Sequence, residues 1–198
     1  MIGEINMSAN LLNEFMKAMG PQVAQEMTRS LGVKDNDAMS MIPQVMPLIL
    51  GGLNRQSQNH GGADRVNHIL NKYGDANVLG DVGGLFSQVL GSSDVTPQLG
   101  GLLGTAGDQA TEQMANQFGL DMGTAAKIIP MLSPLILGFL SNKRDNDGAG
   151  ASGIAALIDQ DGDGSILDDV AGFLLNSGNS GGGGLLGGLL GGLFGGKR

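Results

Sequence analysis

The residues best suited to chemistry in this sequence are acids that alternate along one short loop. Aspartates stand at every second position from Asp159 to Asp163, and Gly164, Ser165 and Ile166 follow them. This order, D-x-D-x-D-G-x-I, opens a helix–loop–helix calcium loop, in which alternate carboxylates converge on a cation that takes six to eight oxygen ligands. The spacing therefore predicts one EF-hand-like Ca²⁺ site. Mg²⁺ is less suited, because it takes few carboxylates and keeps several waters.

The predicted ligands are three alternating carboxylates, one backbone carbonyl and one acid where the chain leaves the loop. They are Asp159, Asp161, Asp163, Ser165 and Asp169. The motif wants a bidentate Glu at its twelfth position, where this chain has Val170. Asp168 or Asp169 could close the shell, or waters could replace the missing carboxylate. The competing interpretation is a solvated acidic turn without an ion.

The charge of the chain excludes one class of partner and favours a cation. The formal net charge is −8, and a nucleic-acid binder needs clustered Lys and Arg. Between Asp145 and Asp169 there are seven aspartates and no Lys or Arg. The chain has no cysteine, which rules out disulfides and thiolate metal sites.

Residue patterns typical of enzymes are missing. The two histidines, His60 and His68, lack the four-residue spacing of a zinc-binding helix. The sequence also contains no G-x-S-x-G, no G-x-x-x-x-G-K-[ST] and no G-x-G-x-x-G after a strand. We expect a protein that is not an enzyme.

The elements that must position the acidic loop come from an internal duplication. Ile42–Gly51 matches Ile129–Gly138, including a Pro-x-x-x-Pro pair in each, at an offset of 87 residues (130 − 43). Met27 pairs with Met114 and Gly32 with Gly119 at the same offset. After one inserted residue, Val78–Leu85 matches Ile166–Phe173 at an offset of 88.

Each copy shows the periodicity of helices, so the predicted fold class is all-α. Apolar residues recur three or four apart, and the proline pair predicts a kinked or partly broken core helix in both copies. The predicted helices are Asn10–Met19, Gln22–Leu31, Asp35 or Asp37 to about Asn54, Ala63–Lys72 and Val78–Leu90, with counterparts at Ala151–Ile158 and Ile166–Leu175.

We divide the chain into a first repeat (8–92), a second repeat that carries the calcium-type loop (95–176) and a Gly/Leu-rich tail (177–198). The repeats are small, so they either form two units or share one core, and a shared core is favoured. Asn142–Gly150 is expected to be a polar loop. The most apolar runs, Met41–Leu53 and Ile128–Leu140, fall short of the roughly 20 residues of a membrane span and predict buried helices. No secretory signal is visible, so the expected location is cytoplasmic.

The first repeat is an internal control for the loop. Its equivalent segment, Lys72–Asn77, has one acid, Asp75, and should not bind calcium. Asp81 of this repeat corresponds to Asp169. An acid kept in the copy without a site could simply flank a helix start, which is the alternative to a ligand role for Asp169.

The tail alternates glycine pairs with Leu-Leu or Leu-Phe pairs and ends in Lys197-Arg198. Glycine costs about 1 kcal/mol per helical position relative to Ala, so the tail should not hold a helix alone in water. It is either a linker-like tail or a segment for self-association or for an anionic membrane surface.

The proline element, the loop Asp159–Val170 and the Gly/Leu tail together resemble the bacterial domain-of-unknown-function 937 family. The resemblance covers most of the chain and implies an all-helical bacterial protein without an established activity. We therefore expect a non-enzymatic scaffold or interaction protein with one calcium loop, which binds an unknown protein partner or itself. The alternative is a membrane- or envelope-associated protein anchored by its tail.

Overall fold

The structure, a computed structural model, describes residues 7–91 and 102–146, which form helices joined by short connections and contain no strand. The predicted all-α class is therefore confirmed for these residues. The helices are α1 (Met7–Leu31), α2 (Asp35–His60), α3 (Gly62–Tyr73), the 3₁₀ helix η1 (Ala76–Gly80), α4 (Val82–Gly91), α6 (Thr105–Phe118) and α7 (Met122–Asn146). The predicted acidic loop, the helices Ala151–Ile158 and Ile166–Leu175, and the tail lie outside the described residues.

Helix α1 is one helix where the sequence predicted two. Pro21 lies inside it, although we expected a second helix to begin there. Side chains four residues apart are buried on both sides of the proline, namely Leu11, Phe15, Met19, Val23 and Met27. Pro21 itself is exposed. Water can satisfy the carbonyl that loses its amide partner, and one continuous apolar face keeps the helix together.

Helices α2 and α7 carry the two proline pairs and run through them without interruption. A partly broken helix, one of the two predicted outcomes, is thus excluded. Both helices are longer than expected, because α2 ends at His60 rather than Asn54 and α7 continues to Asn146. The predicted polar loop from Asn142 is wrong over this last turn. Arg144 fixes the turn by donating to Asn67 of α3 over 3.1 Å and to Ser141 over 3.2 Å.

The predicted helix Val78–Leu90 is two elements, η1 and α4, separated at Asp81. Asp81 has an extended φ of −142° and accepts hydrogen bonds from the start of the next helix. An aspartate favours helix starts over helix interiors, because its carboxylate competes for backbone amides. The helix Ala63–Lys72 is confirmed as α3.

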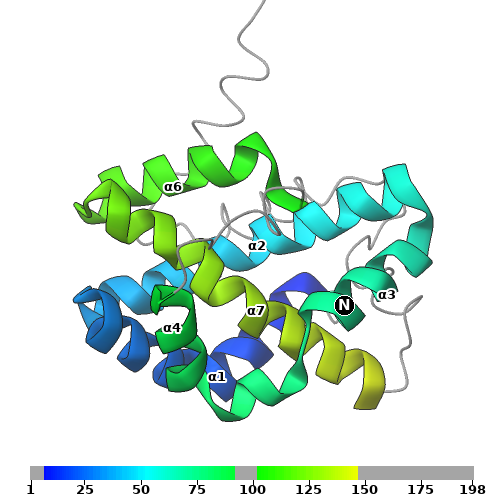
Figure 1. Cartoon of the computed structure of the whole chain (residues 1–198), viewed down its shortest axis with the longest axis horizontal. Coiled ribbons are helices and arrows are strands. Elements are labelled where there is room, and N and C mark those ends of the chain that lie inside the picture. The colour runs from blue at the N-terminus through cyan, green and yellow to red at the C-terminus, as the bar shows by residue number, and fades with distance from the viewer. Residues whose placement is uncertain (1–6, 92–101, 147–198) are drawn as a thin grey trace, which may run out of the picture.

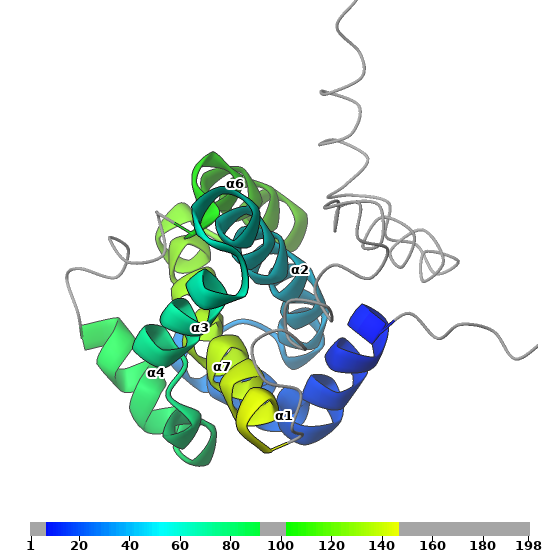
Figure 2. The ribbon, with the colours of Figure 1, turned by 90° about the vertical axis from the view of Figure 1, so that its right-hand side faces the viewer.

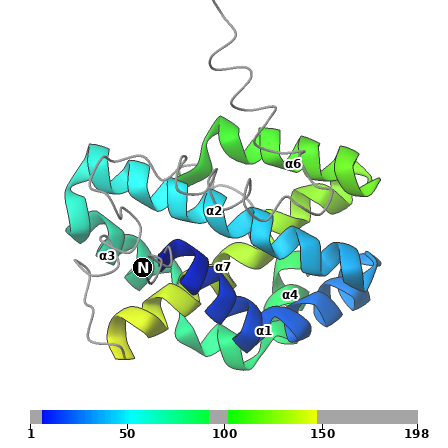
Figure 3. The ribbon, with the colours of Figure 1, turned by 180° about the vertical axis from the view of Figure 1, so that it is seen from behind.

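Helix α7 occupies the middle of the described fold. It packs against α1, α2, α3, α4, α6 and η1. In the view of Figure 1, α6 lies above it and α1 and α4 below, while α2 crosses behind it; Figures 2 and 3 show these helices from the side and from behind. One hydrophobic cluster includes buried residues from Leu11 to Leu140.

Helix α7 is the one described helix that is long and apolar enough to cross a membrane. Its most apolar window is 72% buried inside the protein. The two 13-residue apolar runs were predicted to be buried helices, and they form the core parts of α2 and α7.

Candidate functional site

The predicted metal ligands Asp159, Asp161, Asp163, Ser165 and Asp169 all lie outside the described residues. Within residues 7–91 and 102–146, no three His, Cys, Asp or Glu side chains are grouped so that they could hold a metal ion. His60 at the end of α2 and His68 in α3 are both exposed. The described part of the chain therefore bears on the loop through its predicted counterpart, the segment Lys72–Asn77 and the aligned acid Asp81. We call Gly74–Asp81, which contains both acids and η1, the counterpart loop.

Asp75, the first of the two acids of this counterpart loop, closes a turn. One oxygen of Asp75, Oδ1, accepts hydrogen bonds from the backbone amide of Asn77 at 2.9 Å and from its side-chain amide at 2.8 Å. The carbonyl of Asp75 accepts from the amide of Val78 at 3.2 Å. The carboxylate thus caps η1, which is a common role for an aspartate at this position.

The counterpart loop lies directly on the backbone of α7. A Cβ atom added to Gly138 of α7 would stand 2.7 Å from the carbonyl oxygen of Asp75 and 3.1 Å from Cγ2 of Val78. A Cβ added to Gly74 would stand 2.6 Å from the carbonyl oxygen of Leu137. Glycine on both sides permits this close approach. The counterpart loop therefore connects α3 to α4 and holds both helices against α7, and we call it a joint in this sense.

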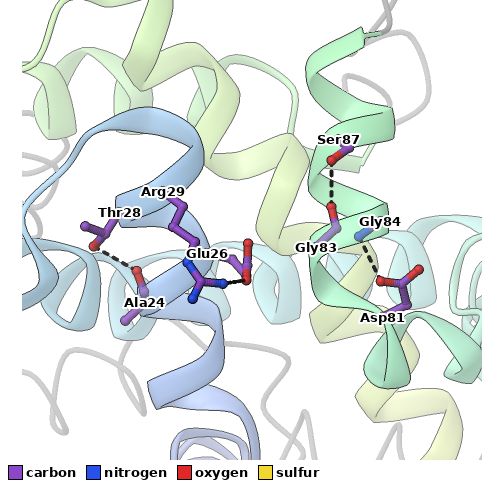
Figure 4. Close-up of polar contacts among 8 residues, drawn as sticks. All are labelled: Ala24, Glu26, Thr28, Arg29, Asp81, Gly83, Gly84 and Ser87. Carbon is purple, nitrogen blue, oxygen red and sulfur yellow. Dashed lines mark hydrogen bonds and ion pairs between the residues drawn. The ribbon is translucent and has the colours of Figure 1, made fainter.

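Asp81 caps α4 at the exit of the joint. Its Oδ1 accepts from the amide of Gly84 at 2.9 Å, and its carbonyl accepts from the amide of Leu85 at 3.1 Å. Figure 4 shows this cap beside Glu26 of α1, whose Oε2 lies 3.6 Å from a Cβ built on Gly83. Asp81 corresponds to Asp169, so it illustrates the helix-start alternative for that residue. The ligand role of Asp169 stays a prediction.

Asp121 caps α7, and the sequence analysis missed it. Its Oδ1 accepts from the amide of Thr124 at 3.0 Å, and its Oδ2 accepts from the hydroxyl of Thr124 at 2.6 Å. These hydrogen bonds to the charged form, led by the one from the hydroxyl, lower the pKa of the Asp121 carboxyl. The signal was present, since Asp followed three residues later by Thr can form such a cap. Lys34, at the matching start of α2, makes no side-chain cap.

Comparison with known proteins identifies one family. The family model described as "bacterial protein of unknown function (DUF937)" matches residues 13–143 and 141–197. Neither the curated proteins nor the solved structures gave a match to the chain.

Proposed function

The chain belongs to the bacterial DUF937 family of proteins of unknown function, and we propose that it is a non-enzymatic helical scaffold whose second repeat is held together by one calcium ion. The ion occupies the loop Asp159–Asp169, with Asp159, Asp161, Asp163 and the carbonyl of Ser165 as ligands. Asp169 or water completes the shell. The scaffold presents its surface to a protein partner or to another copy of the chain.

The observation that carries this proposal is the structural role of the counterpart loop. Gly74–Asp81 seats two helices on α7, and Asp75 and Asp81 each close a turn or cap a helix. A loop at this place in the fold holds elements together. Three aspartates at the same place repel one another, and a divalent cation removes that repulsion. The calcium ion is thus a structural clasp for the second repeat.

The duplication behind this argument is supported by matching helix ends. Helices α1 and α6 end at Leu31 and Phe118, and α2 and α7 begin at Asp35 and Met122, each pair 87 residues apart. The glycines at both corners, Gly32 and Gly119, have positive φ values of 70° and 63°. Such values favour glycine at the end of a helix, so the corners share one geometry.

The stabilisation expected from the ion follows from mass action. A ligand that binds only the folded state, at a concentration 100 times its dissociation constant, stabilises by about 2.7 kcal/mol. For a chain of this size, that corresponds to a rise in melting temperature of about 5–11 °C at saturating calcium, and of about 1–2 °C at a calcium concentration equal to the dissociation constant. The incomplete motif, with Val170 at the position of the Glu, places the affinity at the weak end of the range of about 10⁻⁷–10⁻³ M.

The test is a calorimetric calcium titration of the full chain, with thermal melts in calcium and in chelator. One site per chain is expected, together with a higher melting temperature in calcium. Asp161→Ala should abolish both effects. The matched control is Asp75→Ala in the first repeat, which should lower the melting temperature and leave the calcium heat unchanged. Absence of heat and of a thermal shift at millimolar calcium would reduce the loop to an acidic turn.

A further inference from the structure

The two helices that carry a proline pair, α2 and α7, are covered by different elements. Helix α7 is covered by α3, η1 and α4, which belong to the other repeat. The elements that would cover α2 by the same rule follow α7 in the chain, beyond Asn146. The described residues therefore include the elements of the first repeat that cover α7, whereas the equivalent cover of α2 would lie outside them.

Burial differs between the two helices mainly along one side, although Pro43 is also half-buried where Pro130 is buried. Met131, Leu135 and Gly138 of α7 are buried. Their counterparts on α2, Gln44, Leu48 and Gly51, are half-buried. These positions are spaced by four and three residues, so they lie along one side of the helix. We call Gln44, Leu48 and Gly51 the open face of α2.

Gly51 and Gly138 make the contrast sharpest. The carbonyl of Asp75 and the side chain of Val78 cover Gly138 so closely that a Cβ would collide with them. No described atom lies within 4 Å of a Cβ built on Gly51. A glycine in the interior of a helix costs about 1 kcal/mol relative to Ala. Its presence at Gly51 fits a second close backbone approach.

Two polar atoms, one on the open face and one on α6, which packs against α2, also lack a hydrogen-bond partner among the described residues. The Oε1 atoms of Gln44 on α2 and Gln113 on α6 are buried without a hydrogen bond from the described residues. Gln113 corresponds to Glu26, whose carboxylate lies near Gly83 in the first turn of α4. The equivalent helix start in the second repeat would bring free backbone amides to Gln113, and amides of that kind are the donors such an oxygen needs.

We propose that the open face of α2, together with the adjacent side of α6, is the docking site for residues 147–176 of the same chain. By the alignment, the backbone of Asp163 lies on Gly51 as that of Asp75 lies on Gly138, and Ile166 takes the place of Val78. The described part of α7 ends at Asn146, and residues 147–176 follow it directly in the chain. Docking rests on the duplication in the proposed function. It places the calcium loop at the junction of the two repeats.

Thiol labelling of the full chain tests the docking directly. The chain has no cysteine, so one introduced thiol reports only its own position. Leu48→Cys is compared with Leu135→Cys, its buried counterpart, and with Met122→Cys at a site that is 55% exposed. Docking predicts that Leu48→Cys reacts at least about tenfold more slowly than Met122→Cys, at a rate independent of protein concentration. A rate equal to that of Met122→Cys overturns the proposal. Protection that grows with protein concentration also overturns it, because a second copy would then be the cover.

A second test is whether Gly51→Ala raises or lowers the urea midpoint of the full chain. If Gly51 is open in the full chain, Gly51→Ala removes a helix-interior glycine and raises the urea midpoint. If residues 147–176 cover Gly51, the added Cβ collides and the midpoint falls. A raised or unchanged midpoint overturns the proposal.

Running the labelling in calcium and in chelator separates docking from ion binding. Protection of Leu48→Cys in both conditions supports docking even if calorimetry finds no calcium site. Protection that is lost in chelator supports docking and the clasp together. Labelling as fast as at Met122→Cys in both conditions overturns docking, whatever the calcium titration gives.

Discussion

The contact between α7 and the counterpart loop makes Gly138→Ala the most informative single substitution in the described structure. The new Cβ would lie 2.7 Å from the backbone oxygen of Asp75, a distance that real Cβ atoms essentially never show. The oxygen is itself held by a hydrogen bond from Val78, and Cγ2 of Val78 stands 3.1 Å from the same point. Neither neighbour is the free end of a flexible side chain, so backbone must move.

The expected loss of stability in Gly138→Ala is the difference between two effects of the added Cβ. Replacing a helix-interior glycine by alanine stabilises by about 1 kcal/mol. Overpacking costs about 1–3 kcal/mol, and the upper end applies because the collision is with backbone. The net loss should be about 2 kcal/mol, or a fall in melting temperature of about 4–8 °C for a chain of this size.

Urea denaturation followed by circular dichroism measures this loss as a lower midpoint at unchanged slope. Gly83→Ala in α4 is the matched control. The nearest atom to its added Cβ is Oε2 of Glu26 at 3.6 Å, an ordinary contact, so this variant should not lose stability. Gly138→Ala as stable as the wild type would show that the loop does not touch α7 so closely in solution, and the role of the loop as a joint would fall with it.

Two further predictions concern the core and the corner before α7. Phe15 is fully buried, and its ring packs edge-to-face against that of Phe139 at a centroid distance of 5.4 Å. Phe15→Ala should therefore lower the free energy of unfolding in urea by about 3–5 kcal/mol, and Phe15→Leu should lower it clearly less. Equal losses for the two variants would contradict tight packing at this site. Hydrogen bonds with Thr124 lower the pKa of the Asp121 carboxyl in the folded protein. The carboxylate therefore stabilises the fold fully at pH values above the ordinary Asp pKa of about 3.9. This stabilisation disappears as the pH falls through the lower pKa of the folded state. Thermal melts from neutral to acid pH should show the advantage of the wild type over Asp121→Asn narrowing in that range, and a constant difference would refute the cap.

Helical periodicity predicted the fold class and the positions of most helices, and it failed where tertiary packing overrode local signals. Pro21 suggested a break, yet the apolar face from Leu11 to Met27 passes through it. Asn142 and its polar neighbours suggested a loop, yet Arg144 reaches Asn67, which is distant in sequence. Contacts of that kind have no local signature.

The counterpart loop was recognised from the sequence by its place in the repeat, but its closeness to α7 was not. Gly74 and Gly138 are two among 36 glycines, and nothing in their neighbourhoods marks them as a contact pair. The cap at Asp81 was predicted only in part. The sequence analysis considered Asp81 as an acid that flanks a helix start, but it placed the residue inside the predicted helix Val78–Leu90. The calcium loop itself remains a prediction from spacing, because its residues lie outside the described part of the chain.

The central position of α7 has a consequence for how the chain is made. Helices α1 to α4 leave the ribosome first, and the helix that fills the space between them is separated from α4 by a further stretch of chain. At about 5–20 residues per second, the 55 residues from the end of α4 to the end of α7 take roughly 3–11 s to synthesise. During that interval α3, η1 and α4, which all pack against α7, lack the helix that completes their burial. Vectorial synthesis therefore makes the core close late, and the apolar surfaces that α1 to α4 later bury against α7 stay exposed in the nascent chain, where such surfaces are prone to aggregate.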